Sequence, residues 1–516
     1  MKKVTLVALN PMNVISTNLY LLKEYANKDK RITDNYQLFL RFFDSLIPDQ
    51  SNAIDLIIRQ IIDDDSEIVG FSTFCWNIKT IIKCAKIIKK VKPSISIFLG
   101  GPEATGNVDK LLIKYDFIDC IIVGEGEIAF KEYLLYKNGM LKKSEVANLA
   151  YRKEGKTIHN SEKLIENLDD IPPLFSSGAM DVNQIGEKIY SFETLRGCQF
   201  NCSYCFHHKG CHKIRKYSLE RIFAELDMLL SSKKLKYIWI IDPCFNDDEE
   251  RSIQIIRHIV KNNVNQIEFG FEIRNETMSE VFIREMSKLP NIKFVAMGLQ
   301  TTQKESLEAV NRELNIEKFE ENIRLVKKYF DKDISIHVDL IFGLPNNNLE
   351  KYKEDVNYVL EMGCEIFTQP LKILPGTDLE KDIAKYGFVV ADEPPYEVVY
   401  NSSFSYQDMN EAKKINSMLN LFQASDYIRN IVEQICKKQK MRYADIFQEL
   451  GDYFWSRGNT ILFTNYVRVE EKELVALMKN VVKDLYGINC TEQCGHDKEL
   501  QLDWGSVAKQ QKHSIV

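Results

Sequence analysis

The sequence predicts an α/β protein with two successive series of strands and helices and a helical region at its end. Short apolar runs of the kind that parallel sheets bury recur through the first 140 residues, and again from about residue 189. Between two of the early runs, residues 77–91 place isoleucines on one helical face and lysines on the other. This alternation indicates helices that cover a sheet, and therefore a doubly wound N-terminal part.

The length of 516 residues exceeds what one core normally organises and favours roughly three domains. We expect a Rossmann-like domain at 1–140, a linker with a hairpin at 141–188, six strand–helix repeats at 189–394 and a helical domain at 395–516. The strands expected in the first domain are Val4–Leu9, Ile68–Thr73, Ile95–Leu99 and Ile118–Val123. The helices expected in the last domain are Tyr406–Phe422, Asp426–Lys438 and Val469–Tyr486.

The composition excludes several classes of protein. An apolar content of 45% and a charged content of 28% are typical of soluble globular chains. A net charge of −6 gives no basic footprint for nucleic acid, and no apolar run approaches the length of a membrane-spanning helix. The twelve cysteines are scattered and no secretory signal precedes them, which argues against a disulfide framework. We therefore expect a cytoplasmic protein with reduced thiols, no nucleic-acid partner and no membrane span.

The residues 195–206 read L-R-G-C-Q-F-N-C-S-Y-C-F and place Cys198, Cys202 and Cys205 in a C-x3-C-x2-C spacing. Thiolates are soft ligands that suit iron–sulfur clusters, which normally take four of them. With three cysteines in the motif, one iron of a 4Fe–4S cluster keeps an open coordination position. Such an iron can bind a substrate, so the motif indicates a catalytic cluster rather than an electron carrier.

Zinc is the alternative for these cysteines. Structural zinc sites usually use paired C-x2-C knuckles or Cys/His pairs. The neighbours that keep this alternative open are His207, His208, Cys211 and His212. A second candidate, Cys490, Cys494 and His496 near the end of the chain, has a C-x3-C-x-H spacing. We favour the cluster for the first group and unpaired thiols for the second.

Glycine-rich segments follow the expected N-terminal strands. They are S-T-F-C-W-N (72–77), G-G-P-E-A-T (100–105) and G-E-G-E (124–127), with Asn10–Pro11 after the first strand. Open α/β sheets bind ligands beyond the carboxyl ends of their strands, and glycine lets the backbone approach a bulky ligand. No G-x-G-x-x-G follows the first strand, so a dinucleotide fingerprint is absent.

The cysteine motif, with Tyr204 just before its last cysteine, resembles that of the radical S-adenosylmethionine (SAM) enzymes. The resemblance implies that the open iron chelates the amino and carboxylate groups of SAM, and that the reduced cluster cleaves SAM to a 5′-deoxyadenosyl radical. It also implies a partial (β/α)6 TIM barrel with ligand groups at the strand ends, and a reductant such as flavodoxin or ferredoxin. The segments I-F-G-L-P (341–345) and L-P-G-T (374–377) resemble oxygen-independent coproporphyrinogen oxidases and their relatives.

The same resemblance assigns SAM contacts to residues at the ends of the expected barrel strands. It places Tyr204 near the adenine, and Asp242 where the family often holds the SAM amino nitrogen, although the usual G-G-E of that strand is absent. Glu272, Gln300 and Asp339 fall where relatives bind the ribose or the methionyl part. The alternative for each is a satisfied polar group in the barrel interior.

The N-terminal part resembles the cobalamin-binding domain that precedes many radical SAM domains. It lacks the D-x-H-x-x-G motif, and the chain has no histidine before His159, so no imidazole of this domain can ligate cobalt from below. The alternative is a degenerate Rossmann-like domain with a structural role. The residues to which the resemblance assigns cobalamin contacts are Ser72, Thr73, Trp76, Gly100, Gly101, Glu103, Gly124 and Gly126.

Together these resemblances imply a cobalamin-dependent radical SAM enzyme that methylates an unactivated carbon of a small-molecule or peptide substrate. A radical SAM cyclase, rearrangement or oxidative enzyme is the second possibility, and a non-catalytic iron–sulfur or corrinoid-binding protein is the third. A methylthiotransferase is disfavoured because its N-terminal domain supplies three further cluster cysteines, whereas here Cys84 falls on a helix and Cys120 in a strand. The segment P-P-Y-E-V-V (394–399) and the helices after it resemble a C-terminal domain of unassigned function found in some of these proteins.

Overall fold

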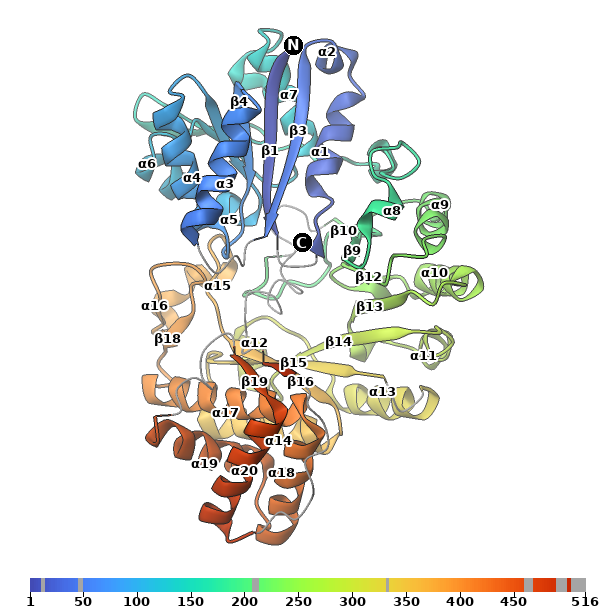
Figure 1. Ribbon diagram of the computed structural model, residues 1–516, viewed down its shortest axis with the longest axis vertical. Coiled ribbons are helices and arrows are strands. Elements are labelled where there is room, and N and C mark those ends of the chain that lie inside the picture. Colours follow the sequence, from blue (N-terminus) through green and yellow to red (C-terminus); the bar gives the residue numbers. More distant parts are fainter. Residues whose placement is uncertain are drawn as a thin grey trace.

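The computed structural model describes residues 1–10, 14–44, 50–206, 213–330, 334–458, 467–488 and 499–502. Figure 1 shows a doubly wound sheet at one end of the molecule, a curved sheet ringed by helices beside it, and a group of helices at the opposite end. This is the predicted order of a Rossmann-like domain, a partial barrel and a helical C-terminal region.

The N-terminal sheet has seven strands in the order β3-β1-β4-β5-β6-β7-β8. The first five are parallel, and β7 and β8 are antiparallel. Every residue of β4 is buried, which explains its continuous apolar run. The strands are β1 Lys2–Asn10, β3 Tyr36–Asp44, β4 Ile68–Ser72, β5 Ser96–Gly100, β6 Cys120–Ile122, β7 Leu149–Lys153 and β8 Lys156–His159.

Helices cover both faces of this sheet because each presents one apolar stripe. In α4, Ile78, Ile81, Ala85 and Ile88 are buried while the lysines face away, as the pattern of residues 77–91 predicts. One face is covered by α3 Gln50–Asp63, α4 Ile78–Val91 and α6 Val108–Lys114. The other is covered by α1 Asn18–Asn27, α2 Lys30–Thr33 and α7 Glu127–Lys137. The short α5 Pro102–Gly106 follows β5.

Two features of this part differ from the expectation. Strand β3 and helix α3 were not expected. Apolar and polar residues are mixed in the edge strand β3, and no clear helix-stop signal follows α3. The expected hairpin forms, but β7 pairs with β6, so the N-terminal sheet continues to His159. The segment after residue 140 therefore begins inside the first sheet.

The central sheet contains the six expected parallel strands, in the order β16-β15-β14-β13-β12-β9. A seventh, β2 Val14–Ile15, comes from the N-terminal segment and pairs with β9, so the two sheets are joined near the start of the chain. The six strands are β9 Ile189–Phe192, β12 Tyr237–Ile240, β13 Glu268–Ile273, β14 Ile292–Gln300, β15 Ile336–Phe342 and β16 Glu365–Pro370.

Side chains alternate between the two faces of these strands. Trp239 and Phe294 lie in a small cluster on the inner face, whereas Val338 and Leu340 belong to the large core under the helices. The helices of this layer are α9 Leu219–Leu230, α10 Glu249–Asn262, α11 Glu280–Met286, α12 Lys304–Ala309, α13 Ile316–Tyr329 and α14 Leu349–Glu361. The segment before β9 contains α8 Val182–Ile185.

The C-terminal helices share one continuous core with the barrel. The Gln423 side chain donates to the carbonyl of Ile366 at 2.9 Å and accepts from its N–H at 2.6 Å, which covers the free edge of β16. The helices of this part are α15 Asp378–Lys381, α16 Ile383–Tyr386, α17 Tyr406–Ala424, α18 Asp426–Gln439, α19 Tyr443–Ser456 and α20 Glu471–Tyr486. Its short strands are β17 Val389–Val390, β18 Val398–Tyr400, β19 Val467–Glu470 and β20 Glu499–Leu502.

Helix α19 was not expected, because its run of aromatic residues obscures the helical period. It buries Phe447, Leu450 and Phe454 against the core. The helix expected from Val469 starts at Glu471, because Val467–Glu470 pairs with β20 instead.

The N-terminal domain and the barrel also meet through the L-P-G-T segment and the chain after it. Tyr396 donates a hydrogen bond to the buried carboxylate of Glu103, and Asn107 lies 3.3 Å from the same hydroxyl. Gly106 passes so close that an added Cβ would lie 2.2 Å from the carbonyl oxygen of Pro375. Glycine is therefore required here for the two parts to touch.

None of the helices in the described part of the chain combines the length and apolar composition needed to cross a bilayer.

Candidate functional site

The three motif cysteines lie on a loop that leaves a short hairpin of β10 Leu195–Arg196 and β11 Arg215–Lys216. Neighbouring segments fix the backbone of the first half of the loop. Ser203 donates its N–H to the carbonyl of Val310 at 2.9 Å and accepts from the N–H of Leu379, also at 2.9 Å. The loop is thus held between the end of α12 and the start of α15.

Cys198, Cys202 and Cys205 form no disulfide, and they lie near enough for their charges to interact with one another or with Tyr204. Three cysteines outside any disulfide on one loop fit a cluster that takes three protein ligands. Burial is the main cause that raises the pKa of the Cys198 thiol, so a positive metal centre is needed to keep this sulfur deprotonated.

Among the described residues, the motif cysteines included, no three His, Cys, Asp or Glu side chains are grouped closely enough to hold one metal ion, so this observation does not separate zinc from a cluster. His207, His208, Cys211 and His212 lie outside the described residues, as do Cys490, Cys494 and His496.

Two further residues near the loop were missed by sequence reasoning. Arg312 donates to the carbonyl of Gly298, and its Nη1 lies 3.9 Å from the sulfur of Cys202. The Nε of Arg312 is buried and has no hydrogen-bond partner among the described residues. Cys244, buried after β12, lies near Cys198, and burial together with that neighbour raises the pKa of its thiol to about 12. Two local signals could have pointed to them: Arg312 follows an asparagine just after the end of α12, and Cys244 follows β12.

Asp242 follows β12 and is completely buried. Its Oδ1 accepts hydrogen bonds from the N–H groups of Thr194 at 2.7 Å and Leu195 at 3.2 Å, and its Oδ2 accepts from the Thr194 hydroxyl. Burial raises the pKa of Asp242 to about 7, against the opposing effect of these hydrogen bonds. The carboxyl thus has structural partners beside the hairpin, and its expected contact with SAM stays a prediction.

The other expected SAM residues lie around the barrel mouth and interior. Tyr204 packs against the large core close to Arg312. Gln300, at the end of β14 with a positive φ of 71°, places its amide over Gly298. Asp339 is the neighbour of Gly298 on β15, and Glu272 lies on β13. The fold therefore gathers these side chains on adjoining strands, while their roles stay predictions.

A cavity of about 510 Å³ lies between the carboxyl edge of the N-terminal sheet and the barrel. On the barrel side it reaches Ser191, Pro243 and Gly376, and it borders the cysteine loop at Gly197 and Phe206. The Ser191 hydroxyl is buried and has no hydrogen-bond partner among the described residues, so it can serve a ligand in the cavity.

The expected cobalamin residues divide into two groups. Five line the cavity: Ser72, Gly100, Gly101, Gly124 and Gly126. A Cβ on Gly124 would meet nothing within 4 Å, so this backbone faces open space that a ligand can fill.

The remaining three of these residues do not line the cavity. Thr73 donates to the carbonyl of Gly100 at 2.8 Å and accepts from the N–H of Ala104 at 3.0 Å, which holds α5 against β5. Trp76 stacks on Phe74, with ring centroids 4.3 Å apart. Glu103 accepts the hydrogen bond from Tyr396 described above, and burial raises the pKa of the Glu103 carboxyl.

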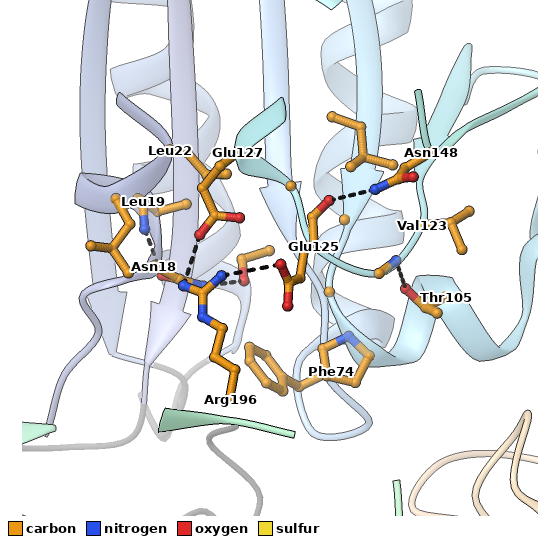
Figure 2. A pocket seen from close by; sticks show the side chains of 18 of the residues that line it. Asn18, Leu19, Leu22, Phe74, Thr105, Val123, Glu125, Glu127, Asn148 and Arg196 are labelled. Atoms are coloured by element: carbon orange, nitrogen blue, oxygen red, sulfur yellow. Dashed lines mark hydrogen bonds and ion pairs between the residues drawn. The ribbon is translucent and has the colours of Figure 1, made fainter. Parts of the chain in front are cut away.

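A group of buried charges forms one wall of the cavity (Figure 2). Arg196 lies 2.8 Å from Glu127, 2.9 Å from Glu193 and 3.5 Å from Glu125. Burial raises the pKa of Glu193. Burial also acts to raise that of Glu125, but hydrogen bonds from Arg215 and the charges of both arginines outweigh it and lower the pKa. Sequence reasoning missed this group because its members come from three separate segments.

Three family models match the chain. Residues 192–359 match the Radical SAM superfamily, residues 43–134 match the B12 binding domain, and residues 384–470 match a protein family of unknown function (DUF4080). The resemblances drawn from the cysteine motif and from the strand exits are thereby confirmed.

Curated relatives match most of the chain at low identity. The cobalamin-dependent radical SAM methyltransferase TokK of Streptomyces tokunonensis is 23% identical over 91% of this chain and 72% of its own length. The 2-(S-pantetheinyl)-carbapenam-3-carboxylate methyltransferase of Streptantibioticus cattleyicolor is 22% identical over the same shares. The solved structure of the cobalamin-dependent radical SAM enzyme OxsB with aqua-cobalamin superposes with a TM-score of 0.67, at 15% identity, over 95% of this chain and 77% of that one.

The chain therefore combines a B12-binding domain with a radical SAM domain. Residues of both domains line the cavity described above.

Replacing Asp242 by asparagine tests whether this side chain is structural. The folded-state pKa lies above the ordinary value, so the native state holds about one extra proton between pH 4 and 7. The stability that this group contributes is present below about pH 4 and is lost as pH rises through 7. Asp242→Asn should flatten that dependence in urea unfolding, and unchanged SAM affinity would show that the carboxyl is only structural. A large loss of SAM affinity with unchanged stability would instead support a contact with the cofactor.

Proposed function

We propose that this protein is a cobalamin-dependent radical SAM methyltransferase that acts on a carbon of a small-molecule or peptide substrate. The observation that carries the proposal is a cavity that the glycine-rich strand ends border on one side and the cysteine loop on the other. The curated relatives that match most of the chain are named as methyltransferases, which favours methyl transfer.

Cys198, Cys202 and Cys205 are the proposed ligands of a 4Fe–4S cluster, which supplies the electron that cleaves SAM. Arg312 is the proposed partner of the SAM carboxylate, because its guanidinium lies beside Cys202 with one N–H unused among the described residues. We assign the orientation of SAM to Tyr204 on the cysteine loop and to Glu272, Gln300 and Asp339 on strands β13, β14 and β15.

Gly100, Gly101, Gly124 and Gly126 let the backbone of the N-terminal domain approach a corrin ring, which supplies the methyl group. Gly101 has a φ of +99°, and a Cβ there would lie 2.5 Å from the carbonyl of Thr73, so the chain can turn this way only with glycine. Ser191 offers a hydroxyl from the opposite wall. The first histidine, His159, ends the edge strand β8, where its Nε2 lies 3.5 Å from Asp109. No histidine is among the described residues that line the cavity, so this lining would offer no imidazole to a corrinoid.

The cluster chemistry needs an external electron, so the proposal includes a small reductant protein such as flavodoxin or ferredoxin. A cytoplasmic location is part of the same proposal, because reduced thiols persist there. A non-methylating cyclase or oxidase uses the same cleavage of SAM and is separated by its products.

The cluster assignment predicts that iron depends on the three motif cysteines. Anaerobic reconstitution should give about four irons per chain. Replacement of Cys198, Cys202 and Cys205 together by alanine should abolish them, as measured by iron and sulfide assay. Cys84→Ala, in a buried helix position of the other domain, is the matched control and should keep the cluster. Full iron content in the triple variant would reject the assignment.

The role of Arg312 predicts a selective loss of SAM binding. A hydrogen bond between charged groups contributes about 1.5–3 kcal/mol, so Arg312→Met should weaken SAM binding by about tenfold to a hundredfold. Equilibrium dialysis of reconstituted protein with labelled SAM measures this. Arg324→Met, on an exposed arginine that pairs with Glu320 on α13, should leave the affinity unchanged. Equal affinities in both variants would remove Arg312 from the site.

Methyl transfer predicts two nucleoside products in equal amounts. One SAM molecule donates the methyl group and leaves S-adenosylhomocysteine, and another is cleaved to 5′-deoxyadenosine. Reduced, reconstituted protein with cobalamin, SAM and a metabolite extract should form both in step when the extract is added. Extract-dependent 5′-deoxyadenosine alone would favour the cyclase or oxidase. Absence of both products would favour a binding protein.

A further inference from the structure

Arg196 stands at the base of the cysteine loop, two residues before Cys198. In the β10–β11 hairpin it is the direct cross-strand neighbour of Arg215. Both arginines reach Glu125: Arg215 donates to its Oε2 at 3.0 Å, and the Nη1 of Arg196 lies 3.5 Å from the same oxygen. The two ends of the loop are therefore fixed to one carboxylate.

That carboxylate belongs to the other domain. Glu125 and Glu127 lie in the G-E-G-E segment after β6, between and beside Gly124 and Gly126, which line the cavity. Figure 2 shows Arg196 pointing from the barrel side toward Glu125 and Glu127. One side chain thus connects the backbone that carries the cluster ligands to the backbone that faces the corrin site.

Arg196, Arg215, Glu125, Glu127 and Glu193 form a network of ion pairs, and water reaches it poorly. The exposed fraction of the side chain is 12% for Arg196 and 6% for Glu127. Buried charges depend on their partners, because water cannot replace a lost partner. If the G-E-G-E segment (124–127) moves, the β10–β11 hairpin must move with it. Otherwise the ion pairs of Arg196 with Glu125 and Glu127 break and leave buried charges unpaired.

The same groups line the cavity, so a ligand that fills it also removes the remaining water from these ion pairs. A cluster bound by Cys198, two residues beyond Arg196, would add a restraint to the hairpin that carries Arg196, beyond the backbone hydrogen bonds of Ser203 that already hold the loop. Each event favours the arrangement that the other needs, and such a coupling is reciprocal.

We propose that Arg196 is a positioning residue that couples corrinoid binding in the cavity to the presence of the cluster on the cysteine loop. This inference rests on the proposed function, which supplies the identity of both ligands. If the network only holds the domains together, its loss lowers stability but leaves the corrinoid affinity independent of the cluster.

The test compares hydroxocobalamin affinity in full-length protein with and without the reconstituted cluster, by equilibrium dialysis. Allosteric couplings commonly amount to about fivefold or more, so wild-type protein should bind at least about fivefold more tightly when the cluster is present. Glu127→Gln keeps the shape of the side chain and removes its charge, and it should bring this ratio close to one.

Glu132→Gln is the matched control. Glu132 lies on the same helix, but it accepts from the N–H of Ala147 at 2.7 Å and pairs with Lys163, away from Arg196. It should keep the wild-type ratio. Arg196→Lys provides a second variant of the network. It keeps the charge but replaces the planar fork, whose three nitrogens each face a different carboxylate, with one compact ammonium, and it should also lower the ratio.

A wild-type ratio of one would overturn the inference while leaving the proposed function intact. A wild-type ratio retained in both Glu127→Gln and Arg196→Lys, with normal thermal unfolding, would overturn it equally. Wild-type protein that binds no corrinoid in either state would contradict the proposed function, and the inference with it.

Discussion

The buried ion pairs of Arg196 hold together the two halves of the candidate site. Three carboxylates and two arginines from different segments meet at the wall of one cavity, where removal of a single partner typically costs about 3–5 kcal/mol. Such a group stabilises the arrangement of the N-terminal domain and the barrel mouth that the structure shows. The separation between the glycine-rich strand ends and the cysteine loop follows from that constraint.

Other contacts between the N-terminal domain and the barrel stabilise the same arrangement. Strand β2 extends the barrel sheet with a piece of the N-terminal segment, and Tyr396 reaches back to Glu103. The close approach of Gly106 to Pro375 leaves no room for a side chain. The C-terminal helices close the free edge of β16 through Gln423, so the barrel needs no further strand on that side.

Local patterns in the sequence predicted most of the architecture and part of the site. The cysteine spacing and the apolar runs are local signals, and both led to the correct domains. The lining role of Gly124 and Gly126 followed from their place after a strand. Thr73 and Glu103 looked equivalent to these glycines in sequence, but their side chains turn toward α5 and Tyr396. Arg196 and Arg312 were missed because Glu125, Glu127 and Cys202 are distant from them in the chain, and no local period reports such contacts.

The central claim is that cobalamin and the cluster border the same cavity of about 510 Å³. Electron paramagnetic resonance tests it most directly, on reconstituted protein in which the corrinoid is in the Co(II) state and the cluster is reduced. The account predicts that the Co(II) signal broadens or relaxes faster when the cluster is paramagnetic, and that the effect vanishes in the triple cysteine variant. A Co(II) signal that is identical with and without the reduced cluster would contradict the claim.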